Sequence, residues 1–214
     1  MTLQELKACL PQLQTLPLPG LTAQLTLAPP SRQRYVRMAQ HQFGRPKKAA
    51  VLLLLYPDTS HRLCFALIRR ADYPGVHSGQ IGFPGGKIEE TDQSSWAAAL
   101  RETHEEIGVP PQAVHQLRAL SALYIPPSNF KVDPFLAWTP KTPQFTLDHK
   151  EVDGLIQVPL VDFLSCQPKH FNAQLQGDAT TEAIPYFELQ QHKVWGATAM
   201  MLAEFQQLMW AFKG

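Results

Sequence analysis

With 214 residues, 44% of them hydrophobic and 17% charged, the chain is long and apolar enough to form one substantial globular domain. Its 19 basic and 18 acidic side chains nearly cancel, so the composition does not favour nucleic acid as a partner. Three widely spaced cysteines form neither a disulfide framework nor a zinc motif. No apolar run is long enough for a membrane span and no signal-peptide pattern is present, so we expect a cytoplasmic protein with no membrane partner.

Residues 1–48 read as an extension that precedes the main domain. Leu3, Leu6 and Leu10 give a short helix an apolar stripe, and a proline-punctuated stretch and a basic, polar run follow them. No motif in this segment indicates chemistry. We therefore assign residues 1–48 to an N-terminal extension used for packing or for forming a homodimer, and residues 49–214 to the main domain.

The domain is expected to begin with a β-hairpin. Residues 49–56 form an aliphatic run typical of a strand that is buried on both faces. Turn-forming residues follow at 57–60, and residues 62–69 are predicted to return as the partner strand. A polar loop over 71–80 then leads to Phe83-Pro84-Gly85-Gly86.

The strongest helix prediction covers residues 93–107. Apolar residues recur there at helical spacing and form a core-facing stripe made up of Trp96, Ala99, Leu100, Thr103 and Ile107. Thr91 or Asp92 is expected to cap its start, and Gly108 to end it in a left-handed conformation. The glutamates of this helix are expected to fall largely on the side opposite the stripe.

Alternating strand and helix patterns continue to the end of the chain. Strands are predicted over residues 116–124, 131–139, 154–159, 170–175 and 184–189, with a short helix over 161–165 and a closing amphipathic helix from 195 to about 212. This order favours an α/β fold in which a mixed sheet lies between helices.

Three carboxylates on the helix over 93–107 form the most informative feature of the chain. Glu102, Glu105 and Glu106 are spaced so that they share one helix face, where like charges repel. A solvated surface face is one explanation, because Arg101 can pair with Glu105. A site for a hard divalent cation with oxygen ligands is the other, and the glycine loop upstream favours it because glycine lets a ligand approach the backbone closely.

Residues 86–109 resemble the signature of the Nudix hydrolases. Arg101-Glu102-Thr103-His104-Glu105-Glu106-Ile107-Gly108-Val109 matches that signature at every charged and glycine position. The interval between Gly86 and Arg101 is one residue longer than usual, so the upstream acid of the signature is Asp92, Glu89 or Glu90. The resemblance implies a Nudix-like α/β/α sandwich with a mixed sheet.

Within that family, the chain is most similar to the coenzyme A pyrophosphatase branch. The Phe83-Pro84-Gly85-Gly86 loop, the preceding segment 76–80, the longer interval and residues 195–199 all resemble this branch. The chain departs from the branch's upstream pattern at Ile68 and Gly75.

The resemblance also implies a metal site and catalytic groups. Glu102, Glu105 and Glu106, with the backbone carbonyl of Gly86, would bind Mg²⁺ or Mn²⁺, which neutralises a diphosphate and lowers the pKa of bound water. One of the glutamates would assist deprotonation of that water, and Arg101 would orient them through a salt bridge. Glu151 resembles a position where many family members place a further catalytic carboxylate; a simple loop acid is the alternative.

Candidate substrate contacts lie on the strand end and loop before the signature. They are Arg69, Arg70, His77, Gln80 and Gly85. The function implied is hydrolysis of the diphosphate linkage in a nucleoside diphosphate derivative. Coenzyme A or acyl-coenzyme A is the leading substrate, giving adenosine 3′,5′-bisphosphate and a phosphopantetheine product. ADP-ribose or another nucleotide sugar is the alternative substrate, and a non-catalytic nucleotide-binding module is the alternative of another class.

Overall fold

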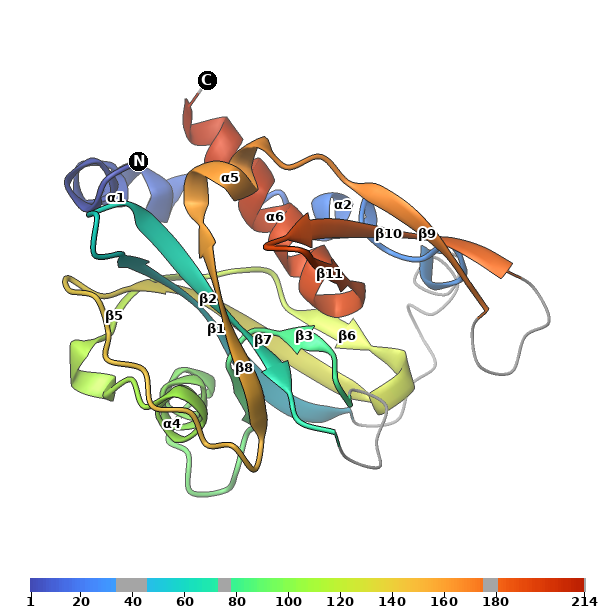
Figure 1. Cartoon of the computed structure of the whole chain (residues 1–214), viewed down its shortest axis with the longest axis horizontal. Coiled ribbons are helices and arrows are strands. Elements are labelled where there is room, and N and C mark those ends of the chain that lie inside the picture. The colour runs from blue at the N-terminus through green and yellow to red at the C-terminus, as the bar shows by residue number, and fades with distance from the viewer. Residues whose placement is uncertain (34–45, 73–77, 175–180, 214) are drawn as a thin grey trace.

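The computed structural model describes residues 1–33, 46–72, 78–174 and 181–213. At its centre, β1 (Lys47–Pro57) and β7 (Phe130–Trp138) pair in parallel from Lys47 and Phe130 to Leu55 and Trp138. Every other pairing in this sheet is antiparallel, so the sheet is mixed, as the sequence predicts. Figure 1 shows it between two layers of helices.

The remaining strands extend the sheet on both sides of this central pair. Beside β1 lie β4 (Gly85–Lys87) and β2 (Leu63–Arg70), and β2 carries β3 (Ile81–Gly82) and β8 (Val152–Pro159). Beside β7 lie β5 (His115–Ala119) and β6 (Leu123–Ile125). The predicted strand over 116–124 is therefore two strands with a break at residues 120–122, where the Leu120 amide donates to the Pro134 carbonyl.

Alternation along β1 divides the core into two parts. Leu53 and Leu55 pack on the face covered by α6 (Gly196–Lys213), whereas Leu52 and Leu54 pack on the face covered by α4 (Ser95–Ile107). All four leucines are at most 1% exposed. Because successive side chains of a strand point to opposite faces, the uninterrupted apolar run predicted the double-sided burial that is observed.

The N-terminal residues pack against the α6 layer. Leu6 and Leu13 of α1 (Leu3–Thr15) are fully buried in the same cluster as α6, and the unpredicted helix α2 (Gly20–Leu25) lies beside α6. Gln24 of α2 donates a hydrogen bond to the buried carboxylate of Glu204 on α6. Residues 1–33 thus contribute to the core, while dimerisation through this segment stays a prediction.

A second, three-stranded antiparallel sheet lies beside the start of α6 (Figure 1). It consists of β9 (Lys169–Gln174), β10 (Thr181–Leu189) and β11 (His192–Trp195). The sequence did not reveal β11, because the turn before it is made by Gln190 and Gln191, which both have positive φ without being glycine.

Short helices complete the fold. They are η1 (Pro111–Ala113), η2 (Pro126–Ser128) and α5 (Leu160–Ser165). Among the helices in the described part of the chain, none combines the length and apolarity that a membrane crossing requires.

Candidate active site

The glycine loop, residues 83–86, leads into β4, which pairs with β1 and contacts α4. Gly85 has a φ of 142° and passes so close to β1 that a Cβ there would lie 2.6 Å from the Cα of Val51. A Cβ on Gly86 would lie 2.5 Å from the Cδ of Glu102. Glycine is therefore required at position 85 for β4 to pair with β1, whereas at Gly86 the neighbouring atoms are the movable carboxylate end of Glu102.

Helix α4 begins and ends at well-defined caps. Ser94, in an extended conformation, accepts a hydrogen bond from the Ala97 amide, and Gly108 ends the helix in the left-handed region. The prediction that Thr91 or Asp92 caps the helix was wrong. Asp92 instead accepts two hydrogen bonds from Arg101, so its side chain faces the interior of the site and not the helix end.

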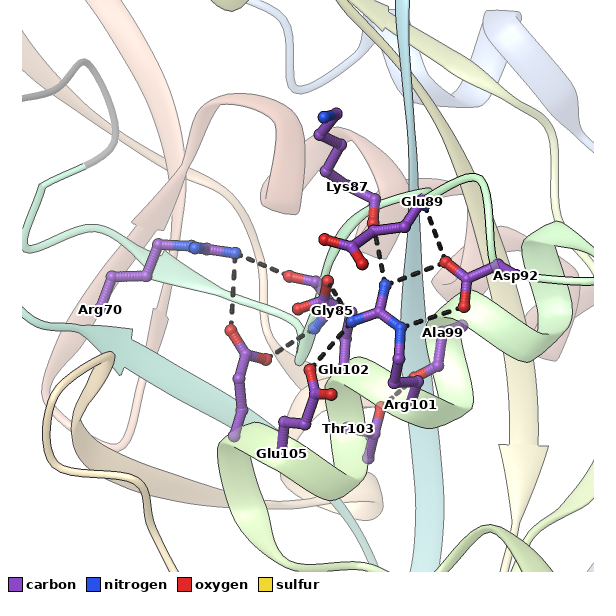
Figure 2. Close-up of polar contacts among 11 residues, drawn as sticks. Arg70, Gly85, Lys87, Glu89, Asp92, Ala99, Arg101, Glu102, Thr103 and Glu105 are labelled. Atoms are coloured by element: carbon purple, nitrogen blue, oxygen red, sulfur yellow. Dashed lines mark hydrogen bonds and ion pairs between the residues drawn. The ribbon is translucent and has the colours of Figure 1, made fainter.

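Arg101 is the hub of the polar contacts on α4 (Figure 2). Its guanidinium donates to both oxygens of Asp92, to Glu102, to Glu105 and to the Lys87 carbonyl, at distances of 2.9–3.1 Å. These contacts use all five of its N–H donors. Hydrogen bonding to Asp92, and then to Glu102, raises the pKa of Arg101 above its usual value. Arg101 is therefore placed to orient carboxylates and has no donor left for a substrate.

The three candidates for the upstream acid differ in their contacts. Asp92 contacts Arg101, whereas Glu90 is exposed and Glu89 contributes its backbone amide to the Asp92 carboxylate. The hydrogen bonds from Arg101 lower the pKa of Asp92 below its usual value. Asp92 therefore holds the ion pair that links the loop to α4.

Glu106 is a buried carboxylate, contrary to the expectation that the glutamates lie largely away from the core. Its side chain is 2% exposed, accepts a hydrogen bond of 2.7 Å from the Gly85 amide, and lies 3.8 Å from the Arg70 guanidinium. Burial raises the pKa of Glu106 to about 7, against the opposing effects of Arg70 and the Gly85 amide. A cation bound there would favour the ionised form.

Glu102 and Glu105 differ in their environments. Glu102 lies under Gly86, and burial raises its pKa while the ion pair with Arg101 opposes the rise. The side chain of Glu105 is 55% exposed and forms the ion pair with Arg101 that its i,i+4 spacing predicts. Glu151, in the turn before β8, is near enough for its charge to contribute to the raised pKa of both Glu102 and Glu106.

The donor chemistry of this cluster fits a hard divalent cation. Carboxylate oxygens are the ligands that Mg²⁺ and Mn²⁺ prefer, and Glu102 and Glu106 are partly desolvated beside a loop that only glycine can form. Within the described residues, no three acidic, histidine or cysteine side chains are grouped closely enough to hold a metal in their present positions. Arg101 and Arg70 instead form the ion pairs of these glutamates.

The candidate substrate contacts separate into different environments. Arg70 donates to the Gly85 carbonyl at 2.8 Å and faces Glu106, whereas Arg69 pairs with Asp153 on the other side of β2. The Gly85 amide is already bonded to Glu106, so its predicted contact with substrate is not favoured by this geometry. Gln80 lines the cleft described next, and His77 lies outside the described residues.

A cleft of about 1130 Å³ adjoins the acidic cluster at β4. Its wall includes Gly85 and Gly86, and it extends between the central sheet, the second sheet and the start of α6. Apolar side chains such as Phe130 and Phe171 make up much of the lining. Of the described residues, the charged ones that line it are Arg32, Arg70 and Lys87, all basic. The cleft is therefore suited to an anionic, partly apolar ligand.

Sequence reasoning missed part of this cleft. Arg32 and Phe171 come from segments far from the signature, and no local spacing pointed to them. Trp195, interpreted from the sequence as a packing residue, both lines the cleft and makes an edge contact with Phe171 at 6.1 Å between ring centroids. Only the three-dimensional arrangement brings these residues together.

Comparisons with known proteins agree on one family. A family model described as NUDIX domain matches residues 46–174. The chain is 32% identical over 161 residues to a protein of Yersinia pestis (strain Pestoides F) named uncharacterized Nudix hydrolase NudL, covering 75% of this chain and 79% of that protein.

Solved structures show the same fold. A MutT/nudix family protein from Enterococcus faecalis is similar with a TM-score of 0.51 and 16% identity, over 98% of this chain and 75% of that chain. The Nudix hydrolase RenU from M. smegmatis is similar with a TM-score of 0.50 and 17% identity, over 80% and 88% of the two chains.

Proposed function

Since the chain belongs to the Nudix family of hydrolases, we propose that it hydrolyses the diphosphate linkage of a nucleoside diphosphate derivative, with coenzyme A or acyl-coenzyme A as the substrate. The observation that carries this proposal is the contact between an acidic cluster on α4 and a cleft whose charged lining residues, among those described, are basic. The products would be adenosine 3′,5′-bisphosphate and phosphopantetheine or its acyl derivative.

The acidic cluster would hold the metal. Glu102, Glu105 and Glu106, with the carbonyl of Gly86, are the proposed ligands of Mg²⁺ or Mn²⁺. When bound, the metal neutralises the diphosphate and lowers the pKa of an attacking water. Arg101 keeps Glu102 and Glu105 in place through its ion pairs, and so acts as a positioning residue.

Two further side chains have proposed roles at the diphosphate. Arg70 lies at the boundary between the acidic cluster and the cleft, and its guanidinium would bind a phosphate oxygen of the substrate. Glu151 is close to the same cluster and exposed, so it would accept a proton from the attacking water. Gln80, on the cleft wall, would donate to the substrate.

A nucleotide panel tests this proposal. Purified protein with Mg²⁺ or Mn²⁺ is incubated with coenzyme A, acetyl-coenzyme A, ADP-ribose and other nucleotide sugars, and the products are identified by mass. We expect adenosine 3′,5′-bisphosphate from coenzyme A, and loss of turnover in Glu105→Gln. Glu188→Gln, which removes an exposed carboxylate paired with Lys169 on the second sheet, is the control and should retain full activity.

The panel also separates the alternatives. Faster hydrolysis of ADP-ribose than of coenzyme A would replace the substrate assignment and leave the chemistry intact. Tight nucleotide binding without metal-dependent turnover of any member of the panel would instead identify a binding module and overturn the enzymatic proposal.

A further inference from the structure

Arg32 is a largely buried arginine with an unusual lack of partners. Its Nη2 donates to the Tyr124 carbonyl at 2.5 Å, and its Nε is buried without a hydrogen-bond acceptor. Within the described residues it forms no ion pair, and burial lowers its pKa to about 10. The carboxylate of Glu182 accepts a hydrogen bond from the Ser31 amide next to it and forms no ion pair with Arg32. Burying a cation without an anion is costly, so this position is expected to gain a counter-charge when the protein is loaded.

A second polar atom in the same cleft has no partner either. The hydroxyl of Ser128, in η2, is buried and makes no hydrogen bond within the described part of the chain. Both Arg32 and Ser128 line the cleft, and η2 follows directly after β6, the strand that contains Tyr124. A guanidinium and a hydroxyl together offer donors that suit a phosphate group.

Another buried arginine shows that Arg32 is distinct. Arg118 also donates to backbone carbonyls, those of Leu13 and Leu16, and also has a buried Nε without a partner. It faces the charge of Glu204, however, and does not line the cleft. Arg118 therefore has a structural setting, whereas Arg32 presents an uncompensated charge to a ligand cleft.

The position of Arg32 separates it from the diphosphate. Strands β4, β1, β7 and β6 lie side by side, with Lys87 opposite Ala49, Ala49 beside Val132, and Val132 opposite Leu123. The Tyr124 carbonyl that holds Arg32 is thus three strands from the loop at Gly86, or about 14 Å. One phosphate pair cannot contact both places, so the group near Arg32 belongs to another part of the same ligand.

We propose that Arg32 and Ser128 form a second anion subsite, which binds a phosphate monoester carried by the substrate in addition to its diphosphate. This inference rests on the proposed function and sharpens it. The subsite would favour nucleotides phosphorylated on the ribose, such as coenzyme A, over those that lack this group, such as 3′-dephospho-coenzyme A and ADP-ribose. Arg32 is a specificity-determining residue in this arrangement.

The test compares substrates that differ by a single phosphate. Hydrolysis of coenzyme A and of 3′-dephospho-coenzyme A is measured in the native protein, Arg32→Gln, Ser128→Ala and the matched control Arg118→Gln. We expect Arg32→Gln to raise KM for coenzyme A by about 10- to 100-fold and Ser128→Ala by about 3- to 10-fold, since a hydrogen bond to a charged group is lost. Neither change should alter KM for the dephosphorylated substrate by more than about 2-fold.

Equal effects on both substrates, or the same selective loss in Arg118→Gln, would overturn the subsite. If Arg32→Gln does not fold, Ser128→Ala and the native protein decide: a native enzyme with equal KM for the two substrates rules the subsite out.

A binding measurement separates failure of the subsite from failure of the proposed function. Titration calorimetry with adenosine 3′,5′-bisphosphate and with AMP needs no turnover. If coenzyme A is not hydrolysed, yet the bisphosphate binds at least about 10-fold more tightly than AMP and Arg32→Gln abolishes the difference, the subsite stands and the substrate assignment falls. If coenzyme A is hydrolysed but the bisphosphate and AMP bind equally, the substrate assignment stands and the subsite falls.

Discussion

Among the described residues, charged side chains are paired at one end of the active-site region and unpaired at the other. On α4, Arg101 and the three glutamates all have partners, and Arg101 uses every donor it has. At the far end of the cleft, Arg32 has one backbone acceptor and no counter-ion in the described part of the chain. A paired cluster keeps its geometry before ligands arrive, whereas an unpaired charge has affinity left for a ligand.

The largest loss of activity is expected from removing one carboxylate of the α4 cluster. Glu102→Gln keeps the shape of the side chain but removes a proposed metal ligand beneath Gly86. We expect kcat to fall by about 10²–10³-fold, because charge stabilisation at the diphosphate is lost. Steady-state assays at saturating Mn²⁺ measure this, and a variant with more than half of native kcat would show that Glu102 is not a ligand.

Replacing Arg101 should cause the next largest loss of activity. Arg101→Lys retains one charge but loses the planar fork that bridges Asp92, Glu102 and Glu105. We expect kcat to drop by roughly 10-fold or more and the free energy of unfolding to fall by about 1–2 kcal/mol. Urea unfolding and kinetics report the two effects separately. Arg62→Lys, at an exposed pair with Asp58, serves as the control and should alter neither quantity appreciably.

Two adjacent arginines on β2 offer a matched pair. Arg70 faces Glu106 and the cleft, while Arg69 pairs with Asp153 at the surface. We expect Arg70→Ala to reduce kcat/KM by about 10-fold or more, and Arg69→Ala to change it by less than about 2-fold. Comparable losses in both variants would return Arg69 to the substrate site that the sequence suggested.

The smallest expected effect is a pH dependence of stability in the metal-free protein. Glu106 has a pKa of about 7 in the folded state against 4.5 for the free side chain. Between these values the folded state binds the extra proton, so the stability present below pH 4.5 is lost as the pH rises through about 7, by roughly 1–3 kcal/mol. Urea unfolding with EDTA across this range measures the slope. Glu106→Gln should flatten it, and an unchanged slope would place the titration elsewhere.

Much of the α4 end could be predicted from the sequence, because its residues are close together in the chain. The spacing of the glutamates, the pairing of Arg101 with Glu105, and the left-handed Gly108 all follow from local helix geometry. The prediction of the N-cap residue of α4 was wrong because Asp92 and Ser94 are both good capping residues. Asp92 bonds to Arg101 instead, and Ser94 caps the helix. Burial of Glu106 could not be predicted, because it depends on how closely β4 approaches α4.

The residues at the cleft end could not be predicted from local sequence patterns. Arg32 donates to the Tyr124 carbonyl on β6 and lines the same cleft as Ser128, although these residues are far apart in the chain. Phe171, on the same cleft wall, comes from the second sheet. From the sequence, residues 1–48 were predicted to be an extension with no role in chemistry. Their contribution to the cleft through Arg32 shows why a segment with no motif can still shape a binding site.

The parallel pairing of β1 with β7 has a consequence for how the protein forms during synthesis. A parallel pair needs a crossover, and here the crossover contains the glycine loop and all of α4. A nascent chain that ends before β7 therefore has the complete glutamate motif but lacks the strand that completes the centre of its sheet. Non-local pairing of this kind is slow compared with hairpin and helix formation. Assembly of the active site should therefore follow emergence of residue 138 from the ribosome.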